Sequence, residues 1–366
     1  MRILVDATPL LLRSAGVKNY LYHWIEHLRA AAGNDSIATF PFSGSMARLD
    51  HERSVAGRAD TWAGLGLLQF LNRSHVRWST RADLFHASTL MRNPPRNARL
   101  TTTVYDMTCW LTPELHTPRN AQAVRRFGER VMTRADGLIS ISESSRRDAI
   151  RILGLAPEKI TVVYPGVPDG FFAVPAEAVK AARDRCHLER PYVLFVGTVE
   201  PRKNLGALLD AWAGLGGSLR QEFELVAAGP AGWRDQAVLK RLRSAPAGVR
   251  YLGYVAETEL PGLTAGATVF AYPSLYEGFG FPVAQAMAAG VPVLTSNVSS
   301  LPEVAAGAAL LVDPHSAGEI RSGLEKLLLS PGLREDLGRI GRARAQRYRW
   351  QECARESLTF FRKLAD

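Results

Sequence analysis

The sequence predicts an α/β protein in which two parallel sheets are each covered by helices on both faces. Short apolar strands alternate with helical segments along nearly the whole chain, in two successive series. The 366 residues are enough for two domains with separate cores. Between the two series, PGVPDGFFAVP (165–175) supplies three prolines and two glycines, a composition typical of a domain boundary. We therefore expect one domain at 1–168, a linker at 169–190 and a second domain at 191–349.

The first series begins with an apolar strand at 2–6 and a helix that follows the small-residue loop SAGVKNY (14–20). Apolar residues recur along this helix at helical spacing and form a single stripe, which Gly33 ends: Val17, Tyr20, Leu21, Trp24, Ile25 and Leu28. Further elements of this series are expected as strands at 83–88, 101–106, 137–142 and 160–166 and as helices at 119–136 and 143–154.

The stretch TWAGLGLLQFL (61–71) has apolar residues on too many sides for an ordinary exposed helix. We interpret it as a helix of the core. The alternative is an apolar surface that contacts a lipid or another protein.

The second series repeats the same alternation. Its strands are expected at 191–197, 223–229, 249–255, 268–274, 291–296 and 308–314. Its helices are expected from Leu205, from Trp233, through Glu259 and from Phe281, followed by charged helices at 317–329 and 331–348. An amphipathic helix at 350–366 is expected to end the chain.

The composition is that of a soluble globular protein, with 46% hydrophobic and 22% charged residues. No run of about 18 apolar residues is present to cross a bilayer. The three cysteines are far apart and lack CxxC spacing, so neither a disulfide framework nor a zinc site is indicated. A reducing cytoplasm fits this pattern.

The formal net charge of +10 belongs mainly to the first half of the chain. Residues 1–165 contain 22 Lys and Arg against 14 Asp and Glu, whereas the remainder contains 23 against 21. A basic half can serve an anionic membrane surface or an anionic acceptor, or it can be a solvated surface. The cluster Arg125, Arg126 and Arg130 leaves the same alternatives open. Nucleic acid is not expected as a partner, because no interleaving of basic and aromatic residues accompanies the charge.

The stretch PSLYEGFGFPVAQAMAAG (273–290) has the residues of an anion-binding turn. A buried strand ends here, Gly278 and Gly280 follow, and Pro282 suits the first turn of a helix. The glycines let the backbone approach a ligand, and the helix N-terminus offers N–H groups and a partial positive charge. The carboxylate of Glu277 can accept hydrogen bonds from hydroxyls. An anion cradle beside such an acceptor suits a sugar attached to phosphate.

Arg202 and Lys203, in VGTVEPRKN (196–204), are the cations expected at the same site. A purely structural role is unattractive, because a basic start to a helix opposes the helix dipole. Two fixed cations can instead stabilise the negative charge that grows on a departing phosphate. Since the chain has no Asp-x-Asp triplet to hold a divalent metal, we expect neither a metal nor a cofactor.

These motifs resemble the retaining GT-B glycosyltransferases of the fourth sequence family, the glycosyl transferases group 1. The donor-binding loop of that family reads Glu-Gly-Phe-Gly, an apolar residue, Pro, and a second Glu eight positions after the first. Glu277 matches the first Glu, whereas Gln285 occupies the second position. The motif EPRKN (200–204) is similar to the motif at this position in a mannosyltransferase-like branch of that family. The similarity covers nearly the whole chain, because it continues through VYDM (104–107), ISISESS (139–145), LGYV (252–255) and SNVSSLPEV (296–304).

The resemblance implies a GT-B fold, in which two Rossmann-like domains with parallel sheets face each other across a cleft. The first domain would bind the acceptor and the second a nucleotide-sugar donor, with the helix 350–366 packing back on the first. Arg202 and Lys203 would act on the leaving diphosphate, and Glu277 would bind hydroxyls of the donor sugar. Many relatives have Gly-Arg where this chain has Gly-Thr198, so Arg202 is expected to take over that anion contact.

Further donor contacts are implied by the same resemblance. Gln285 would bind the ribose hydroxyls, although a plain polar helix position is the alternative. Tyr105 replaces the usual His near carbon six of the sugar, so we hypothesise a donor unusual at that carbon, such as a 6-deoxy sugar. A tight turn is the alternative for Gly16, and an edge-of-sheet turn is the alternative for Asp106. The complete set of implied donor-binding residues is Gly16, Tyr105, Asp106, Thr198, Tyr254, Val255, Gly278, Phe279, Gly280, Phe281 and Gln285.

We therefore expect a retaining, metal-independent glycosyltransferase that moves a hexose, mannose or rhamnose-like, from a GDP-, UDP- or dTDP-linked donor. Its acceptor would be a glycan or a lipid-linked molecule that takes part in the synthesis of cell-surface polysaccharide or lipopolysaccharide. The expected location is the cytoplasm, at the inner face of the cell membrane, with peripheral contact through the basic first domain. The alternative is a catalytically inactive nucleotide-sugar-binding subunit of a glycosylation complex. A nicotinamide-dependent dehydrogenase is disfavoured, because GFGFPV lacks the third glycine and lies late in the chain.

Overall fold

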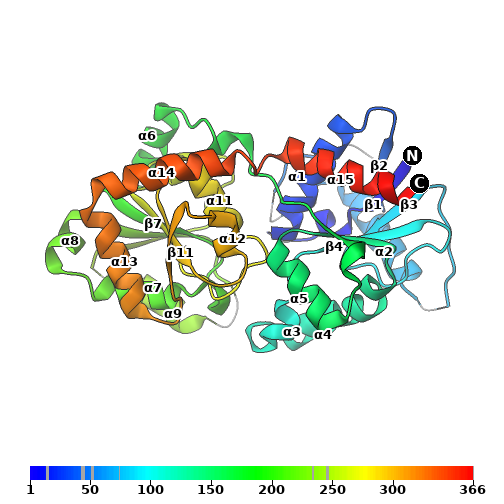
Figure 1. Ribbon diagram of the computed structural model, residues 1–366, viewed down its shortest axis with the longest axis horizontal. Coiled ribbons are helices and arrows are strands. Elements are labelled where there is room, and N and C mark those ends of the chain that lie inside the picture. Colours follow the sequence, from blue (N-terminus) through cyan, green and yellow to red (C-terminus); the bar gives the residue numbers. More distant parts are fainter. Residues whose placement is uncertain are drawn as a thin grey trace. The chain divides into compact units, whose positions relative to one another are not determined.

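The computed structural model describes residues 1–13, 16–42, 46–50, 53–73, 75–232, 235–244 and 247–365. The chain divides into two compact units (Figure 1). The first unit comprises Met1–Gly166 together with Trp350–Asp366, and the second comprises Val167–Arg349. The expected α/β class is confirmed, because within the described residues each unit is built on one six-stranded sheet whose neighbouring strands are all parallel.

The sheet of the first unit has the strand order β2-β1-β3-β4-β5-β6. Its strands are β1 (Arg2–Asp6), β2 (Ser36–Phe40), β3 (Leu84–Ala87), β4 (Arg99–Val104), β5 (Gly137–Ser140) and β6 (Ile160–Val162). Its helices are α1 (Gly16–Ala31), α2 (Arg58–Leu71), α3 (Thr108–Leu111), α4 (Pro118–Arg130), α5 (Glu143–Leu153) and α15 (Trp350–Ala365), with short 3₁₀ turns η1 (Thr8–Leu11), η2 (Pro113–Leu115), η3 (Met132–Arg134) and η4 (Pro157–Lys159).

The sheet of the second unit has the strand order β12-β11-β10-β7-β8-β9. Its strands are β7 (Tyr192–Val196), β8 (Glu224–Ala228), β9 (Val249–Gly253), β10 (Val269–Tyr272), β11 (Val293–Ser296) and β12 (Ala309–Val312). Its helices are α6 (Ala176–Arg185), α7 (Leu205–Ala213), α8 (Gly217–Glu222), α9 (Gln236–Arg243), α10 (Leu260–Ala265), α11 (Phe281–Ala288), α12 (Leu301–Ala305), α13 (Ala317–Leu329) and α14 (Pro331–Ala345), with 3₁₀ turns η5 (Asp169–Phe171) and η6 (Pro201–Lys203).

The central strands of both sheets are buried along nearly their whole length, as expected for parallel strands covered on both faces. Helix α1 buries the predicted apolar stripe, including Tyr20, Trp24 and Leu28. The last helix, α15, packs against α1, where the indole Nε1 of Trp24 donates a 2.9 Å hydrogen bond to the hydroxyl of Ser357. The chain therefore returns to the first unit after Arg349.

Two predictions about the elements need correction, and several elements were not predicted. Residues 169–190, expected as a linker, belong to the second unit, because α6 packs along α10. Strand β2 and helices α3, α6, α8 and α12 have no counterpart among the predicted elements. The stretch 61–71, expected as a core helix, lies in α2, which buries only one side and exposes Trp62 and Phe70. The predicted start of a helix at Trp233 lies outside the described residues, and the described helix begins at Gln236.

Candidate active site

Two turns meet at the carboxyl edge of the sheet in the second unit. The chain runs from β7 to β8 and β9 on one side of the sheet, whereas β10 pairs with the opposite side of β7. This change of direction makes the carboxyl ends of the neighbouring strands β7 and β10 a topological switch point. Open α/β sheets bind their ligands at such points. Residues 200–204 follow β7, and residues 273–280 follow β10. The fold therefore brings the two predicted motifs to one place.

The turn after β7 holds the basic motif in a fixed conformation. Asn204 adopts a left-handed backbone (φ 57°) between η6 and α7. Its side-chain amide donates to the carbonyls of Pro273, at 3.0 Å, and of Pro314, at 2.7 Å. Leu275 in turn donates its backbone N–H to the carbonyl of Arg202 at 2.8 Å. The asparagine of EPRKN thus ties the first turn to the loops that follow β10 and β12.

The turn after β10 depends on a glycine and on two serines. Gly280 is the N-cap of α11 with φ 98°, and a Cβ there would lie 2.7 Å from Leu301 Cδ2. Ser299 accepts a 3.0 Å hydrogen bond from the backbone N–H of Glu277. Ser300 donates to the carbonyls of Glu277 and Phe279, both at 2.9 Å. The SNVSS motif therefore shapes the Glu277 turn from the loop after β11.

Four charged side chains form a cluster at this edge. Lys203 Nζ lies 2.6 Å from Oε1 of Glu277, and Arg202 Nη1 lies 3.0 Å from Oε2 of the same carboxylate. Arg202 Nη2 also donates to Glu200 at 2.8 Å. Two cations and two carboxylates leave the cluster close to neutral. The hydroxyls of Tyr272 and Ser274 complete it, because both donate to Glu277 Oε1, at 3.0 and 2.7 Å.

Glu277 is an ionised acceptor and not an acid. Burial alone would raise the pKa of its carboxyl, but the charges of Arg202 and Lys203, with the hydrogen bonds from Lys203 and Ser274, hold that pKa to about 2. A carboxyl with this pKa has no proton to give near neutral pH. The side chains of Arg202 and Lys203 are 17% and 12% exposed, so a small part of each is accessible to solvent.

The other predicted donor residues of the second unit are spread around this cluster. Gly278, Phe279, Gly280 and Phe281 form the turn itself, and Gln285 lies half-buried in the second turn of α11. Thr198 lies in the loop after β7, which packs so closely on the loop after β8 that a Cβ at Gly229 would overlap the carbonyl of Gly197. Tyr254 and Val255 directly follow β9, and Tyr254 is exposed. Since β8 separates β9 from β7, these two residues follow a strand that is two places away from β7 in the sheet.

The predicted donor residues Gly16, Tyr105 and Asp106 belong to the first unit. Gly16 is exposed and begins α1, where a Cβ would meet no atom within 4 Å. Tyr105 is half-buried and packs edge-on against Tyr20 at a centroid distance of 5.3 Å. Burial raises the pKa of the Tyr105 phenol well above its ordinary value, so this side chain is neutral and cannot act as a base.

Asp106 fits the alternative of a turn residue. Its Oδ1 accepts from the hydroxyl of Thr108 at 2.6 Å and from the backbone N–H of Thr108 at 3.0 Å. Both bonds hold the start of α3.

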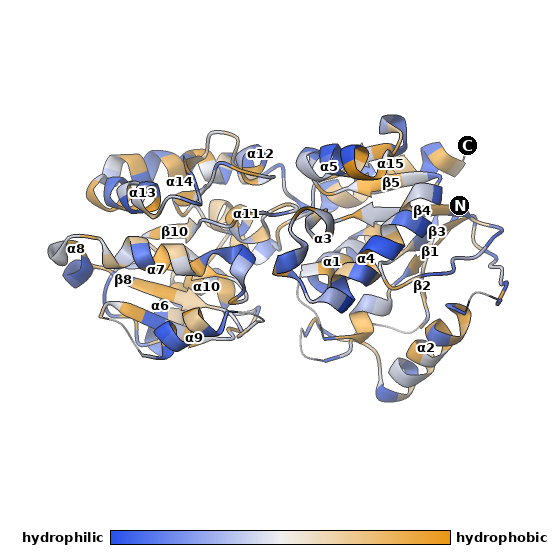
Figure 2. Cartoon of the chain, turned by 90° about the horizontal axis from the view of Figure 1, so that it is seen from below, coloured by the Kyte–Doolittle hydropathy of each residue, from blue (hydrophilic) through white to orange (hydrophobic). Residues whose placement is uncertain are grey.

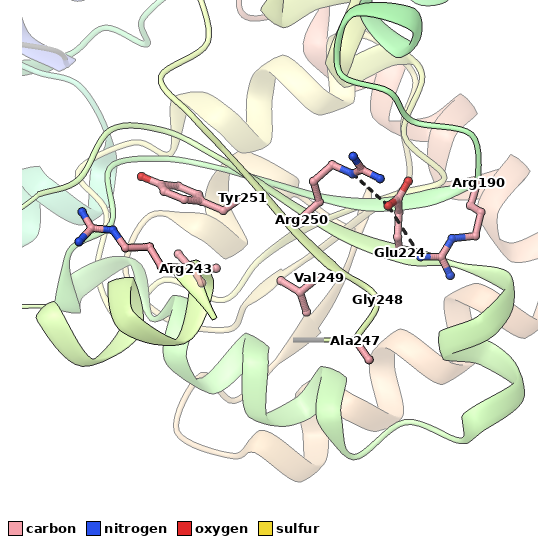
Figure 3. Close-up of a pocket in the computed structure, with 9 residues that line it drawn as sticks. Arg190, Glu224, Arg243, Ala247, Gly248, Val249, Arg250 and Tyr251 are labelled. Carbon is pink, nitrogen blue, oxygen red and sulfur yellow. Dashed lines mark hydrogen bonds and ion pairs between the residues drawn. The ribbon is translucent and has the colours of Figure 1, made fainter. Parts of the chain in front are cut away.

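A separate cavity of about 630 Å³ lies at the opposite, amino-terminal end of the strands. Arg190 precedes β7, Glu224 begins β8, and Arg250 lies at the start of β9. The guanidinium groups of Arg190 and Arg250 approach Glu224 from two sides, at 3.8 and 3.3 Å (Figure 3). Arg190 also donates to the carbonyls of Arg220, Gln221 and Phe223. These contacts join α8 to the sheet and give the cluster a structural role.

The sequence reasoning missed Glu200, Tyr272, Ser274, Ser299 and Ser300 as parts of the site. Glu200 stands directly before the PRK triplet, and its nearness to two predicted cations was an available signal. No spacing rule pointed to the two hydroxyl donors, because Tyr272 at the end of β10 and Ser274 just after it read as ordinary strand-end residues. Across the residues that the structure describes, no group of three or more His, Cys, Asp or Glu side chains could hold a metal ion. Metal independence stays a prediction.

Comparison with known sequences assigns both units. The sequence model described as "Glycosyl transferases group 1" matches residues 181–344, and the one described as "Glycosyltransferase Family 4" matches residues 14–171. The chain is therefore a glycosyltransferase, and its match to the group 1 family lies within the second unit. O-antigen chain mannosyltransferase B of Escherichia coli is 29% identical to this glycosyltransferase over 384 residues, which cover 100% of both chains.

Solved structures agree on the fold. Sucrose-phosphate synthase from Thermosynechococcus elongatus aligns with a TM-score of 0.76 at 20% identity, covering 99% of this chain and 98% of that one. Anabaena HepE in complex with UDP and glucose aligns with a TM-score of 0.72 at 18% identity, covering 99% and 100%. The two parallel sheets of this glycosyltransferase are therefore those of the GT-B fold.

Proposed function

We propose that this glycosyltransferase transfers mannose from a nucleotide-sugar donor to a growing cell-surface polysaccharide of the O-antigen type. The charged cluster of Arg202, Lys203 and Glu277 at the switch point carries the proposal. The full-length likeness to an O-antigen chain mannosyltransferase supports mannose as the sugar. A rhamnose-like 6-deoxy hexose is the second candidate, because Tyr105 replaces the His that relatives place near carbon six. The acceptor is a glycan or a lipid-linked glycan at the cytoplasmic face of the membrane.

The donor diphosphate binds between Lys203 and the N-terminus of α11. An ammonium group has three N–H donors, and Glu277 takes one of them, which leaves capacity for phosphate oxygens. The N-terminus of α11 adds its partial positive charge. Oε2 of Glu277 accepts one bond from Arg202 and can accept another from a sugar hydroxyl. The complex of HepE with UDP and glucose supports a nucleotide ligand for this fold.

The nucleoside extends from the diphosphate toward β9. Gln285, one turn into α11, takes the ribose hydroxyls, and Tyr254 with Val255 contacts the base. Tyr254 is 47% exposed, so its ring is accessible for stacking on a base.

The transfer proceeds with retention of the anomeric configuration and without an enzymic nucleophile. The acceptor oxygen bonds to the anomeric carbon on the face from which the diphosphate leaves, and the bond between that carbon and the phosphate oxygen breaks. The acceptor proton passes to an oxygen of the leaving diphosphate. Glu277 supplies no proton, because its pKa lies near 2. Arg202 and Lys203 stabilise the diphosphate charge in place of a metal ion.

The test is product formation by the purified chain. GDP-mannose, UDP-hexoses and dTDP-rhamnose are each supplied with a short mannan acceptor in the presence of a chelator, and released nucleoside diphosphate is measured. We expect release with GDP-mannose and an α-linked product by NMR. An inverted product would refute retention, and activity that appears only with added manganese would refute metal independence.

The alternative function is an inactive subunit that binds a nucleotide sugar. Gln285 and Tyr105, which depart from the pattern of relatives, favour it. The donor would raise the melting temperature of such a subunit. In the transfer assay, however, the subunit would release no nucleoside diphosphate with any acceptor.

A further inference from the structure

Helix α2 is anchored to the first unit on one side only. Leu68 and Leu71 are buried in the core cluster that includes Phe85. A Cβ at Gly64 would lie 2.8 Å from Pro41 Cγ, so the helix approaches that segment closely. These inner residues fix the position of α2.

The outer side of α2 is apolar and uncovered. Trp62 is 75% exposed, Leu67 is 42% exposed and Phe70 is 50% exposed. At about 100° per residue the three side chains fall within a sector of about 140°, and the exposed Ala63 and Gly66 lie between them. Of the seven large hydrophobic side chains exposed in the described part of the chain, three lie within these nine residues. We call Trp62, Leu67 and Phe70 the α2 face. Figure 2 shows α2 with both orange, hydrophobic and blue, hydrophilic segments.

Arginines border the carboxyl end of the α2 face. Arg73 lies over the ring of Phe70, at 5.7 Å from its centroid. The loop that carries Arg92 is held against the end of the helix, because Asn72 Oδ1 accepts from the backbone N–H of Arg92 at 2.7 Å. Asn93 Nδ2 reinforces this contact by donating to the carbonyls of Leu71 and Val76, at 2.9 and 2.7 Å. The basic rim comprises the exposed residues Arg73, Arg77, Arg92 and Arg96.

The charge of the whole first unit has the same sign as this rim. Its two segments contain 25 Lys and Arg against 17 Asp and Glu, whereas the second unit contains 20 against 18. An apolar helix face flanked by arginines on a basic unit has the composition of an interfacial helix, which buries aromatic and aliphatic side chains among lipid headgroups. Basic side chains beside such a helix add attraction to anionic lipids.

We propose that the α2 face inserts into the surface of an anionic phospholipid bilayer, while the basic rim binds the lipid phosphates. A second copy of this chain fits less well, because it would bring one basic unit against another, and like charges across an interface oppose association. None of the helices among the described residues has the length and hydropathy to cross a bilayer. The contact through α2 is therefore interfacial.

Vesicle flotation tests the proposal without donor or acceptor, so its outcome is independent of the proposed transferase activity. The chain is mixed with vesicles of phosphatidylglycerol and phosphatidylethanolamine, or of phosphatidylcholine alone. We expect binding to the anionic vesicles and little binding to the neutral ones. The double variant Trp62→Ser with Phe70→Ser should bind at least about tenfold more weakly. The double variant Arg73→Gln with Arg77→Gln should bind anionic vesicles more weakly. Its vesicle binding should also depend less on the salt concentration.

Leu329→Ser is the matched control, because Leu329 is 68% exposed and lies in α13 of the second unit. It should bind vesicles like the unchanged chain. Circular dichroism checks that each variant is folded. In addition, brominated lipids should quench the fluorescence of the unchanged chain more than that of Trp62→Phe. The proposal would be overturned if the variant Trp62→Ser with Phe70→Ser bound vesicles as tightly as the unchanged chain. It would also be overturned if brominated lipids quenched Trp62→Phe as much as the unchanged chain. A dimer that the double variant converts to a monomer would assign the α2 face to a second copy instead.

Discussion

Replacing Glu277 by Gln should destabilise the second unit and remove part of its acid sensitivity. The pKa of Glu277 falls from an ordinary value of 4.5 to about 2 in the folded chain. At about 1.4 kcal/mol per pKa unit, this difference corresponds to about 3 kcal/mol of stability at pH 7. Removing one partner of a buried ion pair typically costs a similar amount, about 3 to 5 kcal/mol. We therefore expect Glu277→Gln to lower the free energy of unfolding by about 3 kcal/mol.

The sign of the pH dependence follows from the lowered pKa. Because the folded pKa lies below the unfolded one, the ionised carboxylate stabilises the fold fully above the unfolded pKa of about 4.5. This stabilisation is lost as the pH falls from about 4.5 toward about 2. The gap in stability between the unchanged chain and Glu277→Gln should therefore be widest at neutral pH and should narrow by roughly 2 kcal/mol toward pH 3.

The assay is urea unfolding at several pH values, followed by hydrogen exchange of peptides from β10 and α11, which report on the second unit alone. Glu335→Gln is the matched control, because Glu335 is exposed on α14 of the same unit. It should leave the unfolding free energy within about 0.5 kcal/mol of the unchanged chain. The reasoning is refuted if Glu277→Gln is as stable as the control at pH 7, or if its deficit is the same at every pH.

Three further predictions follow from individual contacts. Glu200→Gln should lower kcat/KM at least about tenfold, because it loosens the partner Arg202, and Glu200→Asp should recover part of the loss. Steady-state kinetics that gave Glu200→Gln the same kcat/KM as the unchanged chain would contradict this. Gln285→Glu should tighten donor binding by up to about tenfold, because a charged acceptor is stronger than a neutral one, and calorimetry that finds weaker binding would exclude a ribose contact. Gly229→Ala should cost at least about 2 kcal/mol, because its φ is 144° and its Cβ would overlap a neighbouring carbonyl oxygen. Gly332→Ala in α14, where a Cβ meets no atom within 4 Å, should leave the melting temperature unchanged or higher, and equal losses in both variants would contradict the steric argument.

The alternation of apolar strands and helices predicted most of the fold, because buried parallel strands read as continuous apolar runs. Strand β2 escaped notice because it lies at the edge of its sheet and exposes two of its five residues. Helix α6 was absorbed into the expected linker, since Pro175 reads as a boundary although it precedes the first residue of a helix. The exposure of Trp62 in α2 depends on which side of the helix another segment covers, and periodicity carries no such information.

The candidate site was predicted in its parts and not in its assembly. Arg202 and Glu277 are 75 residues apart, and only the strand order brings them to one edge. The sequence suggested two cations poised for a diphosphate, whereas the structure pairs both with carboxylates. Glu200 makes the difference, because it brings the cluster close to neutral. The sequence shows that Glu200 adjoins the two cations, but it does not show that the charges pair, since burial determines which charges must be compensated.

The central claim is that Lys203 and its neighbours bind a nucleoside diphosphate without a metal ion, and calorimetric titration tests it most directly. The nucleoside diphosphate with the largest effect on melting temperature is titrated, in the presence of a chelator, into the unchanged chain and into Lys203→Gln. Lys180→Gln, an exposed position on α6, serves as the control. We expect the unchanged chain and the control to bind equally and Lys203→Gln to bind at least about tenfold more weakly. Equal affinity of Lys203→Gln, or binding that requires added manganese, would contradict the account.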